Sequence, residues 1–257
     1  WTLFDASKLP QEKSLGSYKT KTTKPWESLS LQDKIDVLRK AAQQLKSDPR
    51  IIDWESAIAA DTVHHYFVDS NGTQIEQEFH FIYPNLSATA NEGSNTQMRS
   101  LGGFRALCQQ SGFEILDTLD FNAQAKIIAD EAIQLLLAKN CPQDTMDLLL
   151  APDQMMLQIH ESIGHPLELD RILGDERNYA GTSFVTPEMF GSYQYGSKLL
   201  NITFDPTISN QLASYAYDDD GTKAKKTFMI ENGLLKTPLG GACSQFRANF
   251  QEGVANS

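Results

Sequence analysis

The spacing of apolar residues changes several times along the chain, and each change marks an element that the sequence predicts. Within residues 30–49, apolar side chains recur at helical spacing and fall on one stripe. The stripe consists of Leu31, Ile35, Leu38, Ala42 and Leu45. Ser30 can cap this helix and Pro49 helps to end it. We therefore predict a helix that buries one face in this stretch.

From Ile51 to Tyr83 the apolar period is two, which favours strands. The pair Asn71-Gly72 lies between two alternating stretches and is a strong hairpin signal. The pattern predicts strands near 51–61, 63–69 and 73–83 in an antiparallel meander. His64, His65 and His80 lie in this meander, and adjacent strand residues face opposite sides, so we interpret all three as histidines on the strand surface.

A second helix follows, with Asn122 or Asp120 as its cap and a broad buried face that continues to about Lys139. The stretch MDLLLAP, 146–152, predicts a short buried strand. Pro152 and Asp153 then open a third helix, which carries the stretch HESIGH.

Beyond Asp170 the chain is rich in turn residues, and its short apolar stretches predict strands. These stretches are LLNITFD, SYAYDDDGT, KKTFMIENG and LLKTPLGG, and a second hairpin signal lies at Asn232-Gly233. The fold class is predicted as α+β, with a mixed sheet and packed helices followed by a mostly β region. We expect an N-terminal domain over 1–190 and the beginning of a β-rich C-terminal domain over 191–257. Because the chain opens on Trp1 and stops at GVANS, we expect a piece of a longer polypeptide.

Charge and cysteine content restrict the class of partner. The chain has 22 Lys and Arg against 33 Asp and Glu, a formal charge of −11, which opposes a nucleic-acid backbone. The basic stretch KTKTTK, 19–24, is interpreted as a solvated loop, and the apolar runs are too short to span a membrane. Three widely spaced cysteines fit a reducing compartment, so a cytoplasmic protein is predicted.

The stretch HESIGH contains the pattern H-E-x-x-x-H, in His160, Glu161 and His165. Imidazole nitrogens are common zinc ligands, and a neighbouring glutamate can take a proton from an activated water. In a regular helix, positions i and i+5 point about 140° apart, so the two rings would diverge. Glycine at 164 and proline at 166 offer two ways to bring them together: the helix ends before His165, or it widens into a π turn. Without a metal, the same residues would be a capping histidine and a loop histidine.

HESIGHPLELD, 160–170, together with GTSFV, 181–185, resembles the TldD/PmbA metalloprotease family, also labelled modulator of DNA gyrase and microcin-processing peptidase. DDDGT at 218–222 is similar to an acidic turn of that family, and 229–248 is similar to its segment entering the C-terminal domain. The resemblance covers most of the chain.

The resemblance implies that His160 and His165 bind zinc and that Glu161 is the catalytic base. It also implies a third ligand, a cysteine beyond residue 257. Cys243 is the only cysteine downstream of the motif and is interpreted as a buried turn residue. Glu168 is a second local candidate, as a carboxylate that orients a histidine rather than as a direct ligand. Cys108 and Cys141 precede the motif in apolar contexts and are interpreted as packing residues.

The substrates implied by the resemblance are small or unfolded peptides, and the implied assembly is a homodimer or a pair of homologous subunits. A strand edge near the metal could pair with an extended peptide. An alternative from another class is a metal-free homologue that binds or regulates protein partners. Direct DNA binding is a third possibility, against which the net charge argues.

Overall fold

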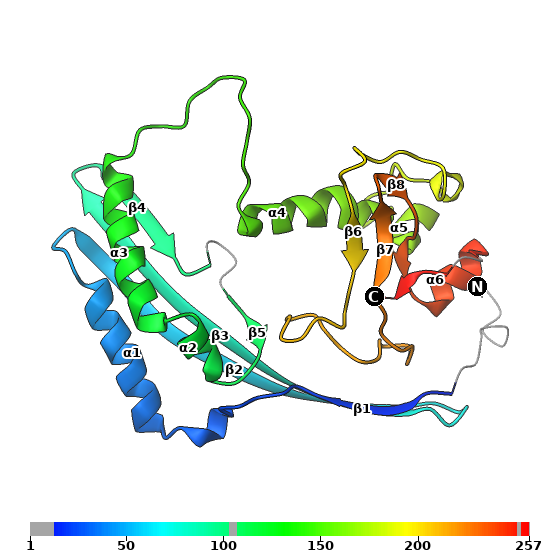
Figure 1. The fold of residues 1–257 in the computed structure, drawn as a ribbon, viewed down its shortest axis with the longest axis horizontal. Coiled ribbons are helices and arrows are strands. Elements are labelled where there is room, and N and C mark those ends of the chain that lie inside the picture. Colours follow the sequence, from blue (N-terminus) through cyan, green and yellow to red (C-terminus); the bar gives the residue numbers. More distant parts are fainter. Residues whose placement is uncertain (1–12, 103–106, 251–252, 257) are drawn as a thin grey trace. The chain divides into compact units, whose positions relative to one another are not determined.

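The longest elements of the chain are two strands, β2 (Ile51–Val68) and β3 (Gln74–Glu92) (Figure 1). This computed structural model describes residues 13–102, 107–250 and 253–256, and these form two compact units. The sheet unit comprises the described residues of 19–63 and 78–153. The motif unit comprises the described residues of 1–18, 64–77 and 154–257. Helices and separate sheets occur together, which confirms the α+β class.

The hairpin between β2 and β3 is where the sequence predicts it. Gly72 has a φ of +89°, a conformation that glycine adopts without strain. One carboxylate oxygen of Asp69 accepts the backbone N–H groups of Asn71 and Thr73, both at 2.9 Å. The predicted break near residue 62 is wrong, because β2 is one continuous strand. No glycine or proline lies near that position to interrupt it.

β3 is the centre of its sheet. It lies between β1 (Leu15–Lys19) and β2, and it also pairs with β4 (Asn95–Ser100) and β5 (Gln109–Gln110). Buried residues alternate with more exposed ones along β3, as expected for a strand with one covered face.

Helix α1 (Leu31–Leu45) begins as predicted, with a capping box. Ser30 Oγ accepts the backbone N–H of Asp33, and the Asp33 carboxylate accepts the backbone N–H of Ser30, each at 3.1 Å. The predicted buried stripe is only partly correct, because the helix buries its C-terminal half. Leu45 and Ala41 are buried, whereas Leu31 and Ile35 are exposed.

Helix α3 (Phe121–Leu137) has the broad buried face that its sequence predicts, and the short helix α2 (Glu114–Thr118) precedes it. The predicted side-chain cap is wrong. Asp120 occupies the N-cap position in a left-handed conformation, and its side chain makes no capping hydrogen bond. The buried face of α3 consists of Phe121, Ala125, Ile128, Ala129, Ala132 and Leu136.

The stretch 146–152 is not the predicted buried strand. Residues 138–151 have no regular secondary structure, and Leu148 and Leu149 are exposed, at 77% and 102%. A strand needs a partner for its backbone N–H and C=O groups, and no strand of the described residues pairs with this stretch. The prediction that Pro152 opens a helix is confirmed by α4 (Pro152–Ile159).

In the motif unit, α4 continues through a π-helical turn (His160–Gly164) and a 3-10 turn (His165–Leu167) into α5 (Leu169–Leu173). Ile163 and Leu167 anchor these turns to a buried apolar cluster. The other buried members of the cluster are Val185, Met229, Ile230 and Leu235.

The remaining strands are short. β6 (Ile202–Phe204), β7 (Thr227–Glu231) and β8 (Leu234–Leu235) form an antiparallel sheet, while β9 (Leu239–Gly240) pairs in parallel with β10 (Ala255–Asn256). Helix α6 (Ala242–Ala248) follows β9. The turn predicted at Asn232-Gly233 is confirmed, since both residues have positive φ, 51° and 77°.

The predicted strand over 214–222 is wrong. The Asp218 carboxylate accepts the backbone N–H groups of Asp220 and Thr222, at 3.0 and 2.7 Å. These bonds close a turn instead of a sheet ladder. Burial raises the pKa of Asp218, whereas these backbone hydrogen bonds favour its ionised form.

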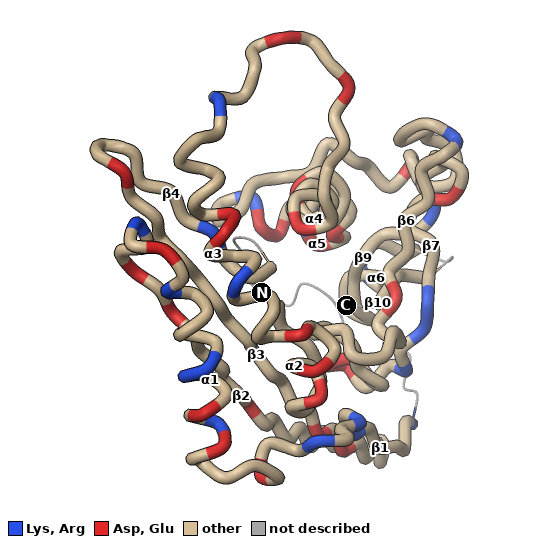
Figure 2. The backbone as a smooth tube through the Cα atoms, turned by 60° about the vertical axis from the view of Figure 1, so that its left-hand side comes forward, with Lys and Arg blue, Asp and Glu red and all other residues tan. Residues whose placement is uncertain are grey.

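Acidic residues are distributed over both units, with lysines and arginines between them (Figure 2). The formal charge of −11 is therefore spread over the molecule and does not come from a single acidic segment. Over the ranges that the structure describes, no helix has both the length and the apolar character required to cross a bilayer.

Candidate metal centre

The π-helical turn brings the two motif histidines together. The backbone N–H of His165 donates to the carbonyl of His160, a bond across five residues that stacks one position over the other. The two ring centroids lie 4.3 Å apart with the rings at 74° to each other. The pairing of His160 with His165 is thus present, and the widened turn produces it.

The two flanking residues act differently from what the sequence suggests. His165 has helical dihedral angles, φ −55° and ψ −44°, so Pro166 does not end the helix before it. The proline instead enters the first turn of the 3-10 segment, a position that needs no backbone N–H. Gly164 has φ −54°, and a Cβ placed there would meet only the Ile159 carbonyl oxygen, at 3.8 Å. The turn therefore does not depend on glycine.

His160, Glu161 and His165 form a group whose potential ligand atoms all lie within 4.8 Å of one another. His160 Nε2 and Glu161 Oε1 are 4.0 Å apart, and these two side chains are 56% and 62% exposed. Two imidazoles beside a carboxylate are a donor set that suits zinc, and the His160 ring is exposed and free to turn towards an ion shared with His165. The residues present fit this metal.

Behind His165, two further residues form a chain of polar contacts. Glu168 Oε1 lies 2.8 Å from His165 Nδ1, and Glu168 Oε2 accepts a hydrogen bond from Arg171 Nε at 2.9 Å. The Arg171 side chain is only 10% exposed. Its hydrogen bond to Glu168 raises the pKa of Arg171 further, so the guanidinium stays charged.

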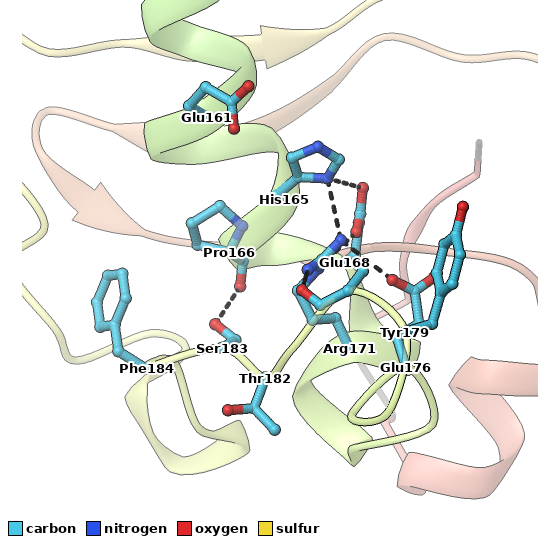
Figure 3. A pocket seen from close by; sticks show the side chains of 11 residues that line it. Glu161, His165, Pro166, Glu168, Arg171, Glu176, Tyr179, Thr182, Ser183 and Phe184 are labelled. Atoms are coloured by element: carbon cyan, nitrogen blue, oxygen red, sulfur yellow. Dashed lines mark hydrogen bonds and ion pairs between the residues drawn. The ribbon is translucent and has the colours of Figure 1, made fainter.

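A pocket of about 690 Å³ opens beside these residues, with Glu161 and His165 on its wall (Figure 3). The pocket is also lined by Pro166, Glu168, Arg171, Glu176, Tyr179, Ala180, Thr182, Ser183 and Phe184. Ser183 fixes one side, because its Oγ donates to the Pro166 carbonyl at 2.7 Å and accepts the Val185 N–H at 2.9 Å. The stretch 181–185, which the sequence singles out, thus contributes to the pocket wall.

Tyr195 supports the π turn from another part of the motif unit. Its hydroxyl donates to the Ser162 carbonyl at 2.6 Å. In a π turn, backbone carbonyls lose their usual helical partners, so an external donor stabilises the widened geometry. Burial raises the pKa of Tyr195, and the hydroxyl therefore remains a donor across the neutral range.

The other histidines and the cysteines take no part in this group. Within the described ranges, no cysteine and no other histidine joins His160 and His165. His80 Nε2 lies 2.6 Å from Glu78, in the sheet unit.

The cysteines differ from what the sequence predicts. Cys141 is exposed, so it is not a packing residue, and Cys243 is exposed on α6, so it is not a buried turn residue. Cys108 is half-buried, and burial raises the pKa of its thiol.

Comparison with known proteins gives the family. The model of the PmbA/TldA metallopeptidase central domain matches residues 24–139, and the model of the C-terminal domain matches residues 143–251. The chain belongs to the PmbA/TldD metallopeptidase family. The family predicted from HESIGHPLELD is therefore confirmed.

Curated relatives carry the same family-level description. A metalloprotease of Methanocaldococcus jannaschii is 34% identical over 177 residues, which cover 67% of this chain and 35% of that protein. A metalloprotease TldD homologue of Buchnera aphidicola is 29% identical, over 84% of this chain and 44% of its own length. A zinc metalloprotease TldD homologue of Saccharolobus solfataricus is 26% identical, over 80% and 43%. The chain thus spans less than half the length of each of these relatives.

Solved structures show the same fold. A protein of Thermotoga maritima, described as a modulator of a DNA gyrase, has a TM-score of 0.67 and 20% identity, over 88% of this chain and 49% of that one. TldE of Thermococcus kodakarensis has a TM-score of 0.58 and 16% identity, over 94% and 52%. At these identities the likeness concerns the fold alone.

Arg171, Glu176, Ser183 and Tyr195 were not predicted as site residues. Arg171 lies three residues after Glu168, a spacing that places two side chains on one helical face, so a signal for it was present. Tyr195 and Glu176 gave no comparable signal, since tertiary folding alone brings them to the motif.

Proposed function

We propose that this chain carries the zinc-binding histidines and the general base of a peptidase. The observation that supports the proposal is the pairing of His160 with His165 by the π turn, with Glu161 beside them. His160 and His165 would hold the ion through one nitrogen each. A zinc ion bound there supplies a Lewis acid for the scissile carbonyl and lowers the pKa of a water.

Glu161 moves the protons in this scheme. Its carboxylate takes a proton from the attacking water as the carbon–oxygen bond forms, and it gives that proton to the amine nitrogen as the peptide carbon–nitrogen bond breaks. The exposure of Glu161, 62%, lets it reach both water and substrate at the pocket wall.

The remaining parts of the proposal come from the family. A third ligand, a cysteine beyond residue 257, would complete the three protein ligands that catalytic zinc sites use. The substrates would be small or unfolded peptides lying along the pocket. The assembly would be a pair of homologous subunits, which fits the name TldE of one structural neighbour, or a homodimer.

The test measures zinc content and peptide cleavage on the full-length protein. We expect about one zinc per chain, loss of zinc and cleavage in His160→Ala, and loss of cleavage with retained zinc in Glu161→Gln. His80→Ala is the matched control, because His80 lies in the sheet unit and pairs with Glu78. A full-length protein that stays metal-free after zinc addition would favour the regulatory alternative.

A further inference from the structure

The hydrogen bond between His165 and Glu168 determines which nitrogen of His165 can bind a metal. The ionised Glu168 carboxylate can only accept, so the contact of 2.8 Å requires a proton on His165 Nδ1. When the ring is neutral, it carries only this one proton, so Nε2 keeps a free lone pair that can bind a metal. Arg171 Nη2 lies 3.3 Å from the same Nδ1, but a guanidinium only donates and cannot bond to a nitrogen that already carries the proton.

Glu168 in turn is held by Arg171 from α5. Arg171 uses each part of its guanidinium: Nε bonds to Glu168 at 2.9 Å, Nη2 pairs with Glu176 at 3.0 Å, and Nη1 donates to the Ala180 carbonyl. The dashed contacts in Figure 3 show this arrangement around His165. Arg171 therefore connects the histidine side of the pocket with the wall over 174–180.

The same arginine separates negative charges. Glu168, Asp170 and Glu176 have carboxylate oxygens within 4.8 Å of one another. Like charges at this distance repel, and the buried guanidinium offsets the repulsion. Without it, Glu168 would turn towards water, and His165 would lose the acceptor that fixes its proton.

We propose that Arg171 is a positioning residue of the candidate metal centre. It holds Glu168 against His165, so that Nε2 of His165 is the free ligand, and it fastens the pocket wall at Glu176 and Ala180 to the same histidine. That Nε2 of His165 binds zinc rests on the proposed function. The position of the proton on His165 does not, and it can be measured in the metal-free protein.

The experiment compares three variants of the full-length protein with the wild type. Arg171→Gln removes the positive charge and the planar guanidinium group with its several N–H donors. Arg171→Lys keeps the charge as a single point and loses the planar fork. Glu168→Gln replaces one of the two acceptor oxygens by an N–H₂ donor, so His165 and Arg171 can no longer both donate to this side chain, with a minimal change in volume.

Arg247→Gln is the matched control. Arg247 binds Asp175 through Nη2 at 2.8 Å, so it ties the same loop from another side. Arg247 lines no part of the pocket at His165. If loop attachment alone matters, this variant should behave like Arg171→Gln.

Two readouts are measured on each protein. Zinc affinity is obtained by competition with a chelator, and the proton position on His165 is obtained from ¹⁵N NMR of the metal-free protein. We expect Arg171→Gln and Glu168→Gln to weaken zinc binding roughly 10- to 100-fold, the range for residues that orient a ligand. Arg171→Lys should fall between these and the wild type, and Arg247→Gln should match the wild type.

In the metal-free wild type, His165 should show the Nδ1–H tautomer, and Arg171→Gln should show a mixture. An unchanged tautomer and unchanged zinc affinity in both Arg171→Gln and Glu168→Gln would overturn the positioning role. Equal losses in Arg171→Gln and Arg247→Gln would overturn it too, in favour of general loop support. A wild type that binds no zinc but shows the tautomer change would overturn the proposed function alone.

Discussion

The sheet unit and the motif unit depend on different kinds of interaction. The sheet unit is built from long elements, α1, β2, β3 and α3, whose apolar side chains gather in one large buried cluster. The motif unit uses short elements, and its candidate site is held by single polar contacts such as those of Tyr195 and Arg171. Burial in a large cluster therefore dominates the first unit, whereas in the second a smaller apolar cluster anchors the turns at Ile163 and Leu167 and directed hydrogen bonds set the geometry of the site.

The largest effect is expected from a substitution in the motif unit that changes catalysis and leaves stability unchanged. Glu161→Gln should lower kcat for peptide cleavage by about 10²- to 10⁴-fold, the contribution of a general base. Because Glu161 is 62% exposed, the melting temperature should stay unchanged. Steady-state kinetics and thermal unfolding of the full-length protein measure the two quantities. Cleavage at the wild-type rate would remove Glu161 from the mechanism.

The second test targets burial in the sheet unit. Phe121 is 2% exposed at the start of α3, and Phe121→Ala should lower the free energy of unfolding by about 3–5 kcal/mol. Leu149→Ala, at a fully exposed position, should change it by less than about 0.5 kcal/mol. Denaturant unfolding measures both. Equal losses in the two variants would show that the stretch around Leu149 is packed in solution.

A smaller effect is expected where one hydrogen bond supports the π turn. Tyr195→Phe removes the donor to the Ser162 carbonyl and should cost about 0.5–1.5 kcal/mol of stability. Because that carbonyl lies between the two histidines in sequence, zinc affinity should fall as well. Tyr193→Phe is the control, since its ring packs edge-on against Tyr195 with centroids 6.1 Å apart. Tyr193→Phe keeps this ring contact and removes only a hydroxyl, so an equal loss of zinc affinity in the control would show that the bond from Tyr195 to the Ser162 carbonyl is not the cause.

The smallest effect is expected at Gly164. Its φ of −54° suits any residue, so Gly164→Ala should preserve zinc binding and stabilise the fold by about 0.4–1 kcal/mol. Gly233→Ala is the contrasting variant, because φ is +77° and a Cβ would lie 2.4 Å from the Gly196 carbonyl oxygen. It should destabilise by more than about 1 kcal/mol. Zinc loss in Gly164→Ala would restore a special role for this glycine.

The sequence predicted those parts of the fold that local patterns determine. The capping box at Ser30, the turns at Asn71-Gly72 and Asn232-Gly233, and the start of α4 at Pro152 each depend on a few neighbouring residues. Predictions failed where long-range pairing decides. The exposed stretch 146–151 has strand composition but no pairing strand among the described residues, and 214–222 forms a turn because Asp218 binds its own backbone.

The candidate site was partly predictable for the same reason. H-E-x-x-x-H with Gly164 and Pro166 indicated that the helix must end or widen, and it widens. The sequence could not distinguish these two outcomes, because the choice depends on how Ile163 and Leu167 are buried and on the Tyr195 hydroxyl. Ser162 and Tyr195 are more than thirty residues apart in the sequence, so no local pattern reveals their hydrogen bond.

The π turn gives two faces of one helix different residue spacings. Ile163 and Leu167, four apart, both enter the apolar cluster, while His160 and His165, five apart, meet on the open side. Deleting one residue between the histidines would produce the shorter H-E-x-x-H spacing of a regular helix, but it would also rotate every later residue by about 100°. An engineered conversion to that spacing would consequently have to redesign the packing of Leu167 as well as the ligands.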